Sequence, residues 1–228
     1  KTGLGKWTER ILQRWNYRYI NRFTACWVPD YRGDVALAGE LSNPVHLPDI
    51  PVTYIGSLSR FTPCNNAAAN NNLLIILSGP EPQRTLLENK MLQDLKQHNG
   101  KTTLIRALPG HKVGLQVPEN VTVYNHVPAD VLNAMICAAD MIISRSGYTT
   151  VMDIMKAGKK SILIPTPGQA EQEYLAQHLY EKKLVYTVSQ NNFSLAEALT
   201  AAGEFSFQQK QYDMEVYKTV LKEFTERI

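Results

Sequence analysis

Short apolar runs alternate with longer amphipathic segments from residue 73 to the end of the chain. The predicted strands are Leu73–Leu77, Thr103–Leu108, Val121–Tyr124, Met141–Ile143, Ser161–Ile164 and Val185–Val188. The predicted helices are Gln83–His98, Ala129–Ala138, Tyr148–Ala157, Gln169–Glu181 and two segments near 194–202 and 208–227. Strands that alternate with helices indicate a parallel sheet with helices on both faces. The predicted fold class is therefore α/β, with a Rossmann-like sheet.

The segment before this repeat has a different pattern. Residues 1–22 carry six basic side chains and one acidic side chain. Arginines recur every four residues from Arg10 to Arg22, and apolar or aromatic residues recur every four residues from Trp7 to Tyr19. This spacing predicts a basic amphipathic helix. Its aromatic face either packs against the rest of the protein, which we favour, or meets an anionic lipid surface.

A junction follows the basic helix. An apolar segment at 23–28 ends at Pro29, and prolines punctuate the next twenty residues. Val52–Ile55 is predicted to be a strand, and the small polar residues 62–72 are predicted to be a loop.

Composition narrows the function classes. The 228 residues carry a net charge of +3, which does not indicate nucleic acid as a partner. The three scattered cysteines show neither a disulfide framework nor zinc spacing, which predicts a reducing, cytoplasmic setting. The sequence contains no run of 18 consecutive apolar residues, so no membrane-spanning helix is predicted. The sequence contains neither an Asp-x-Asp motif nor a His/Cys cluster, so no metal site is predicted. No cofactor is expected either. The chain begins at Lys1 rather than Met, so we expect a fragment.

Polar loops follow four of the predicted strands. They are Ser78-Gly79-Pro80-Glu81, Asn125-His126, Ser144-Arg145-Ser146-Gly147 and the stretch 165–173. Ligands of open α/β sheets bind outside the carboxyl ends of the strands. The four loops therefore predict a cleft of nucleotide size.

The loop after Met141–Ile143 is suited to phosphate. The helix that it opens exposes unpaired N–H groups and the positive end of its dipole. Gly147 leaves room for phosphate near the backbone, Ser146 can cap the helix, and Thr149 and Thr150 can donate from hydroxyl groups. Arg145 can pair with a diphosphate or with an acidic group across a domain interface. A serine in this position can also be a helix cap alone.

Other side chains are suited to sugar hydroxyls. Asp153 can accept two hydrogen bonds from a ribose diol, and Gln172 and Glu173 can read the hydroxyls of a second sugar. Acidic residues this early in a helix can also serve the helix dipole alone. His126 is more readily a base-contacting or packed histidine than a catalytic one, and Cys137 is expected in the core.

The motif Ser-Arg-Ser-Gly-x-x-Thr-x-x-Asp at 144–153, with Gly-Gln-x-Glu-Gln-Glu at 168–173, resembles the donor-binding half of a two-domain GT-B glycosyltransferase. It is most similar to the family of the peptidoglycan enzyme that adds N-acetylglucosamine to a lipid-linked acceptor. The resemblance implies that the partner is a nucleoside diphosphate sugar, with a UDP-sugar favoured. It also implies that donor activation needs no bound metal. The implied donor-binding residues are Gly79, His126, Val127, Arg145, Ser146, Gly147, Thr149, Thr150, Asp153, Gln172 and Glu173.

The resemblance assigns each of these a role. Ser146 and Gly147 match the residues that bind the diphosphate in the family. Gly79 lies in the loop that corresponds to the family's glycine-rich first loop. The ribose falls on Asp153, and the base falls near His126 and Val127. The family reads the transferred sugar with two glutamines; Glu173 stands where the second is expected, which leaves the sugar's identity open.

The resemblance also implies a domain organisation. Residues 1–50 form the tail of an N-terminal acceptor domain, 51–204 form the donor-binding domain, and 205–228 form a helix that packs back towards the N-terminal domain. The general base and the acceptor site, which can be lipid-linked, belong to that N-terminal domain, so this chain alone is expected to be inactive. A cytoplasmic protein is expected, with peripheral membrane contact through residues 1–22 left open.

Three alternatives remain at this point. One is a nucleotide-sugar epimerase of the same fold, and another is a non-catalytic donor-binding subunit of a split transferase. A hydrolase with Ser146 as nucleophile is disfavoured, because the Gly-x-Ser-x-Gly elbow is absent.

Overall fold

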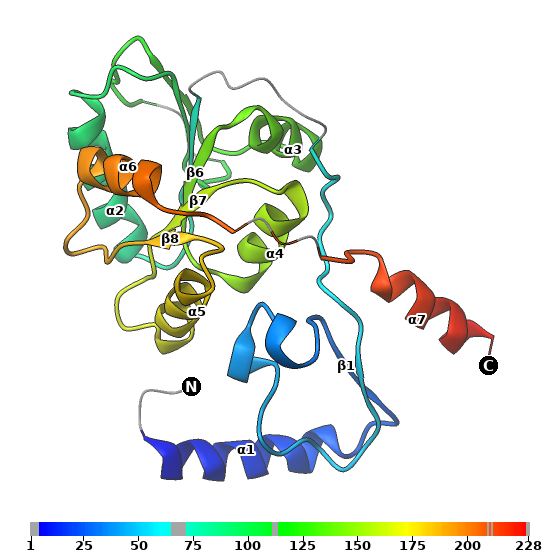
Figure 1. The fold of residues 1–228 in the computed structure, drawn as a ribbon. Helices are drawn as coiled ribbons and strands as arrows, with labels where there is room; N and C mark the ends of the chain where they lie inside the picture. Colours follow the sequence, from blue (N-terminus) through cyan, green and yellow to red (C-terminus); the bar gives the residue numbers. More distant parts are fainter. Residues whose placement is uncertain (1–4, 65–71, 111–113, 209, 211, 227–228) are drawn as a thin grey trace. The chain divides into compact units, whose positions relative to one another are not determined.

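A computed structural model describes residues 5–64, 72–110, 114–208, 210 and 212–226 (Figure 1). The chain forms two compact units, one from residues 1–59 and 211–228 and the other from residues 60–210. The extents 1–50, 51–204 and 205–228 that the resemblance implies stay a prediction. Lys1 of the basic segment, most of the polar loop 62–72 and parts of the stretch 208–227 lie outside the described residues.

The larger unit is built on a six-stranded sheet whose paired strands are all parallel, in the order β5-β4-β3-β6-β7-β8. The strands are β3 (Leu73–Ile76), β4 (Thr102–Ile105), β5 (Val121–Tyr124), β6 (Met141–Ser144), β7 (Ser161–Leu163) and β8 (Tyr186–Thr187). The helices are α2 (Gln83–Leu95), α3 (Ala129–Ala138), α4 (Tyr148–Ala157), α5 (Ala170–Glu181) and α6 (Leu195–Glu204). The predicted α/β Rossmann-like class is therefore confirmed.

The helices cover both faces of this sheet. Figure 1 shows α2 and α6 on one face and α3, α4 and α5 on the other. The core between the sheet and α2 and α6 is apolar, because alternate residues of β3 point to that side: Leu73 and Ile75 are buried together with Met91 of α2 and Ala198 of α6. The connections leave β3 towards β4 and leave β6 towards β7, in opposite directions. The topological switch point therefore lies between β3 and β6.

The last predicted helix is shorter than expected. The sequence predicts a helix near 208–227, whereas α7 spans Val216–Thr225. The backbone before it is used elsewhere: the Gln208 N–H donates to the Lys183 carbonyl, and Phe205 and Phe207 pack edge to face with ring centroids 4.9 Å apart. These contacts lie just before and at the expected start of the helix, and the helix itself begins at Val216.

The expectation about cysteines is wrong. Cys64 and Cys137 form a disulfide across 73 residues of sequence, which ties the start of the larger unit to α3. Cys137 is accordingly half-buried and bonded rather than a core thiol, whereas Cys26 is free. Scattered cysteines do not reveal pairing, because pairing depends on tertiary approach. Disulfides persist mainly in oxidising compartments, so this bond does not support the reducing setting.

The smaller unit holds α1 (Lys6–Ile20), the paired parallel strands β1 (Cys26–Val28) and β2 (Val52–Tyr54), and α7. Short 3-10 turns occur at Gly33–Val35 and Gly39–Leu41. The C-terminal segment packs on this unit: Trp27 and Phe224 meet edge to face at 5.1 Å, and the Tyr31 hydroxyl donates to the Asp213 carbonyl at 2.9 Å.

The aromatic face of α1 is not buried within this unit. Trp7, Trp15 and Tyr19 are 74%, 64% and 52% exposed. The polar side of the helix makes the contacts: the Tyr17 hydroxyl donates to the His46 carbonyl at 2.5 Å, and Asn21 donates to Asp49 at 2.8 Å. Within its own unit the aromatic face is therefore uncovered, and the favoured expectation that it packs against the rest of the protein stays a prediction. Among the helices described, none is long and apolar enough to cross a membrane.

Candidate functional site

The loops at the switch point meet around Gly79. Ile76 at the end of β3 pairs with Ser144 at the end of β6, so the two following loops start side by side. Gly79 has a φ of +101°, a conformation that favours glycine. A β-carbon at this glycine would lie 3.5 Å from Thr166 Oγ1 and 3.9 Å from Arg145 Nε. The loops after β3, β6 and β7 therefore converge, as the sequence predicts.

The N-terminus of α4 opens onto this region. Gly147 is the residue directly before the helix, and it has no side chain with which to cap it. Ser146 therefore does not cap α4, contrary to expectation: it is fully buried, and its hydroxyl donates to the Gln172 carbonyl at 2.8 Å. A β-carbon on Gly147 would meet nothing within 4 Å, so the space before the helix is open. A helix N-terminus beside open space can hold an anion.

The polar side chains of α4 follow the helical spacing. Thr149 is exposed, and Thr150 and Asp153 are half-buried. Thr149 and Thr150 lie four and three residues before Asp153, which places all three on one side of the helix. The described geometry thus puts a carboxylate in the second turn of the helix.

Gln172 and Glu173 are held by their own loop. The Gln172 side chain accepts from the Thr166 N–H at 3.0 Å and donates to Gln169 at 2.5 Å. Glu173, which is exposed, accepts from the Gly168 N–H at 3.0 Å. Both side chains therefore shape the β7–α5 loop, an engagement that spacing alone does not reveal.

Arg145 lies differently from the expectation. Its side chain is 1% exposed and donates to three backbone carbonyls, those of Gln83, Ile164 and Pro165, at 2.9, 3.2 and 3.3 Å. Burial lowers the pKa of Arg145 to about 10, so the group stays protonated at neutral pH. Within the described chain no partner is found for Arg145 Nε or for the buried Thr166 Oγ1. The guanidinium is thus turned into the loops, not outward to an acidic group.

The loop after β5 carries the candidate base contacts. His126 is exposed and Val127 is buried, and the Asn125 carbonyl accepts from the Leu108 N–H at 2.8 Å. The side chain of Asn125 is buried and accepts from Arg106 at 3.1 Å. The structure therefore anchors this loop just before His126.

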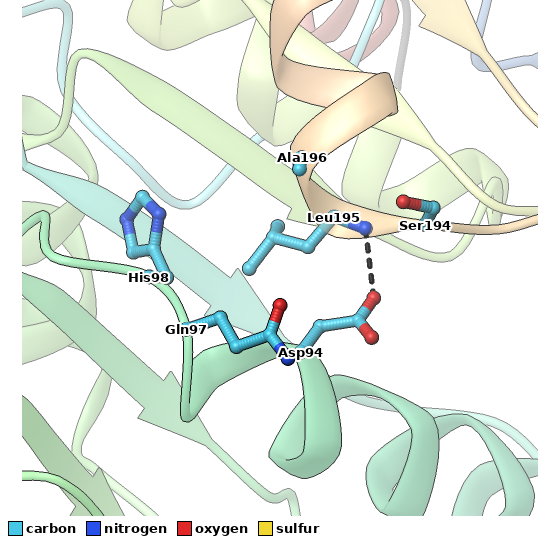
Figure 2. Close-up of a pocket in the computed structure, with 6 residues that line it drawn as sticks. All are labelled: Asp94, Gln97, His98, Ser194, Leu195 and Ala196. Atoms are coloured by element: carbon cyan, nitrogen blue, oxygen red, sulfur yellow. Dashed lines mark hydrogen bonds between the residues drawn. The ribbon is translucent and has the colours of Figure 1, made fainter.

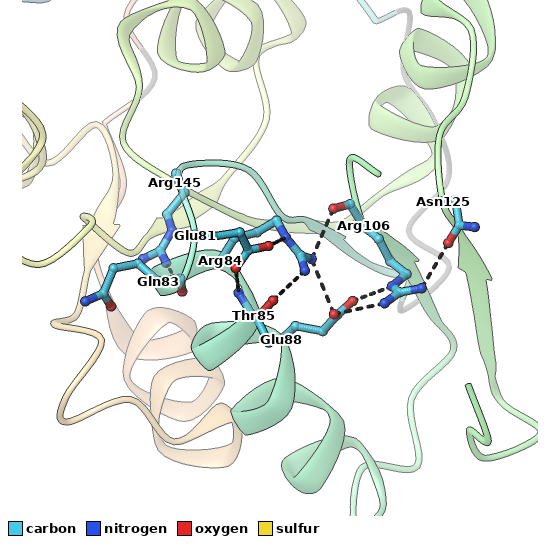
Figure 3. A network of polar contacts seen from close by, with 8 residues as sticks. All are labelled: Glu81, Gln83, Arg84, Thr85, Glu88, Arg106, Asn125 and Arg145. Atoms are coloured by element: carbon cyan, nitrogen blue, oxygen red, sulfur yellow. Dashed lines mark hydrogen bonds and ion pairs between the residues drawn. The ribbon is translucent and has the colours of Figure 1, made fainter. Parts of the chain in front are cut away.

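A buried charge network lies beside these loops (Figure 3). Arg84 and Glu88, in the first two turns of α2, contact Arg106 and, through it, Asn125. Hydrogen bonding to the Glu88 carboxylate raises the pKa of Arg106. Sequence reasoning missed this network. The available signals were the four-residue spacing of Arg84 and Glu88 and an arginine directly after a strand.

A family profile and known proteins can now be set beside this geometry. The profile described as Glycosyltransferase family 28 C-terminal domain matches residues 73–228, more than half of the chain. The chain belongs to glycosyltransferase family 28. The family assignment confirms the resemblance that the motifs at 144–153 and 168–173 indicate.

One curated protein is similar in sequence, and two solved structures are similar in fold. UDP-N-acetylglucosamine--N-acetylmuramyl-(pentapeptide) pyrophosphoryl-undecaprenol N-acetylglucosamine transferase from Sulfurihydrogenibium sp. is 29% identical over 155 residues, which cover 66% of this chain and 42% of that protein. Spinosyn forosaminyltransferase SpnP has a TM-score of 0.55 at 15% identity, covering 89% and 55%. Glycosyltransferase VinC in complex with dTDP has a TM-score of 0.50 at 15% identity, covering 80% and 50%. This chain thus spans less than half of the first relative.

A pocket elsewhere in this family 28 domain is separate from the site. It has a volume of about 120 Å³ and lies between the end of α2 and the start of α6 (Figure 2). Asp94 accepts there from the Leu195 N–H at 2.8 Å and so caps α6. Because α2 begins at the carboxyl end of β3 and runs back along the sheet, this pocket lies towards the opposite edge. Among the described residues no His/Cys/Asp/Glu cluster could hold a metal ion.

Proposed function

We propose that this chain is the donor-binding domain of a glycosyltransferase that takes a sugar from a nucleoside diphosphate sugar, with a UDP-sugar favoured. One observation carries the proposal. The N-terminus of α4 begins after Gly147, which has no side chain to cap it, and faces open space there, at the switch point where ligands of such sheets bind. The family assignment supports the same class of reaction.

The site residues take the following roles in this proposal. The diphosphate lies over Gly147 and the first turn of α4, with Gly79 close by and Ser146 beneath. Asp153 accepts from the ribose hydroxyls, and His126 and Val127 contact the base. Gln172 and Glu173 face the transferred sugar. The complete proposed set is Gly79, His126, Val127, Ser146, Gly147, Thr149, Thr150, Asp153, Gln172 and Glu173, with Arg145 acting from behind.

The names of relatives support a nucleotide donor. The curated relative is named for UDP-N-acetylglucosamine, and the solved VinC structure holds dTDP. Uracil is favoured here because the curated relative matches in sequence, whereas VinC shares only the fold. The transferred sugar stays open, because Glu173 stands where a second glutamine is expected.

The acceptor and the general base are proposed to lie outside this chain. The chain spans 42% of the curated relative, and that relative's name includes an undecaprenol-linked acceptor. A bound donor without a positioned acceptor and base reacts slowly, since proximity and proton transfer supply much of the rate. The chain alone should therefore bind the donor without transferring sugar.

Membrane contact through residues 1–22 belongs to the same proposal. The exposed Trp7 and Trp15 accompany arginines at four-residue spacing, the pattern of a helix that lies on an anionic surface. In this proposal the protein is cytoplasmic and bound peripherally to the inner membrane face, the surface that holds a lipid-linked acceptor.

Calorimetric titration of the folded chain tests the proposal. UDP and UDP-sugars are expected to bind, and GDP is expected to bind at least about tenfold more weakly, about 1.4 kcal/mol. Absence of heat with every nucleoside diphosphate would overturn the proposal. Conversion of the sugar when the full-length protein meets donor alone would instead indicate the epimerase.

A further inference from the structure

Two sets of polar contacts converge on the first two turns of α2 (Figure 3). On one side, Arg145 Nη2 donates to the Gln83 carbonyl at 2.9 Å. On the other side, Arg84 and Glu88 engage Arg106. Because α2 begins just after the Gly79 loop, this short stretch of helix touches the ends of several neighbouring strands.

Glu88 is the centre of the second set. It is 3% exposed, and Arg106 makes a bidentate contact with it: Nε donates to Oε1 at 2.5 Å and Nη2 donates to Oε2 at 3.1 Å. Arg84 donates to the same Oε2 at 3.3 Å and to Glu81 at 2.6 Å. The third guanidinium nitrogen of Arg106, Nη1, donates to Asn125 Oδ1 at 3.1 Å. A planar guanidinium can make these contacts together, which an ammonium cannot.

The position of Asn125 gives this network a consequence for the cleft. Asn125 directly follows β5 and directly precedes His126 and Val127, the proposed base contacts. Arg106 directly follows β4, and its N–H donates to the Tyr124 carbonyl at 2.9 Å. The nucleoside end of the cleft is therefore fixed to α2 through Glu88 and Arg106.

Arg145 fixes the other end in the same way. Its guanidinium joins the start of α2 to the carbonyls of Ile164 and Pro165, which follow β7. The loop that it belongs to leads into Gly147 and α4. The diphosphate end of the cleft is therefore also fixed to α2, but by a different arginine.

The energetics favour positioning over stability as the role of these groups. A buried ion pair stabilises little, because desolvation of both charges offsets their attraction, and apolar replacements are often neutral or better. Here Arg84 and Glu88 are buried, and the side chain of Arg106 is 12% exposed, beside a proposed ligand cleft. A group that is costly to bury and that orders two loops is suited to setting geometry.

We infer that the start of α2 fixes the positions of the loops at the two ends of the donor cleft, each end through a different arginine. We call this arrangement the brace. Arg106, held by Glu88, is a positioning residue for the base loop, and Arg145 is a positioning residue for the diphosphate loops. The inference rests on the proposed function, adds Arg106 to the residues that act on the donor, and gives Arg145 a role that needs no pairing with the donor's charges.

The experiment measures the affinities of UDP, uridine and inorganic pyrophosphate for the wild type and two variants by calorimetric competition. Arg106→Lys keeps the charge on Glu88 but cannot also reach Asn125. It should weaken uridine and UDP about tenfold and leave pyrophosphate unchanged. Arg145→Lys should weaken pyrophosphate and UDP about tenfold and leave uridine unchanged.

Asp94→Ala is the matched control, because it loosens the other end of α2 and the cap of α6 without touching either arginine. All three affinities should stay at the wild-type values in this variant. Where Arg106→Lys does not fold, Asn125→Ala tests the same contact while the pair of Glu88 and Arg106 remains.

The outcomes distinguish failure of the proposed function from failure of the brace. A folded wild type that binds none of the three probes overturns the proposed function. A wild type that binds UDP, with variants that lose uridine and pyrophosphate affinity in equal proportion or lose neither, overturns the brace. A purely structural role predicts the equal loss, together with lowered thermal stability.

Discussion

Replacement of Gly147 by alanine separates the needs of the fold from those of the ligand. The backbone there has φ −70° and ψ 139°, a conformation open to any residue, and an added β-carbon meets nothing within 4 Å. The protein therefore does not require glycine at this position. The free energy of unfolding should stay within about 1 kcal/mol of wild type, with a small gain possible from the less flexible unfolded chain.

Binding should respond very differently. A methyl group at Gly147 would occupy the open space in which we place the diphosphate. A hydrogen bond to a charged group contributes about 1.5–3 kcal/mol, and the helix dipole about 0.3–1 kcal/mol. Loss of one such contact corresponds to about a tenfold to a hundredfold fall in affinity for UDP.

Calorimetry of UDP binding, together with urea unfolding, measures both quantities in Gly147→Ala. Gly203→Ala is the matched control, because a β-carbon at this glycine in α6 also meets nothing within 4 Å. The control should bind UDP as wild type does. A Gly147→Ala protein with unchanged stability and unchanged UDP affinity would refute the placement of the diphosphate.

Three further predictions concern stability. Replacement of both Cys64 and Cys137 by serine should lower the free energy of unfolding by about 2–4 kcal/mol, measured by urea unfolding without reductant, because a 73-residue cross-link is lost; an unchanged midpoint would contradict this. Asp94→Ala should cost about 1 kcal/mol, since the Leu195 N–H loses its cap, and Asp94→Asn should restore most of it. Hydrogen bonds from Arg84 and Thr85 lower the pKa of Glu81 below 4.5, so its contribution is present above pH 4.5 and is lost as the pH falls through the lowered value. Glu81→Gln should therefore flatten the fall in unfolding free energy below pH 4.5, and a slope equal to wild type would count against the contact.

Local patterns were sufficient to locate the strands and helices of the larger unit, with one clear difference in extent: the strand predicted at Thr103–Leu108 is β4 at Thr102–Ile105. The helices Ala129–Ala138 and Tyr148–Ala157 begin and end as predicted, because short apolar strands and polar turns separate them clearly. The convergence of the loops follows from topology, since the carboxyl ends of parallel strands share an edge. These are properties that neighbouring residues determine among themselves.

Contacts between distant residues were not predictable in this way. The hydroxyl of Ser146 bonds to a carbonyl 26 residues later, and Arg145 turns inward to carbonyls of two other loops. The disulfide joins residues 73 apart, and Glu88 meets Arg106 from another element. Each depends on where the fold brings a partner, which residue spacing along one element does not encode.

The exposed aromatic face of α1 shows a limit of another kind. Its amphipathic pattern was evident, and the helix forms at Lys6–Ile20. The pattern does not say what the apolar face meets, and within its own unit that face remains exposed at Trp7 and Trp15.

The most direct test of the central claim is an NMR titration of the isotopically labelled chain with UDP. If the diphosphate lies at the start of α4, the largest amide shifts should occur at Gly147 and Thr149, with smaller shifts at Gly79 and His126. Saturable shifts confined to Asp94–His98 and Leu195, around the pocket of Figure 2, would contradict the claim.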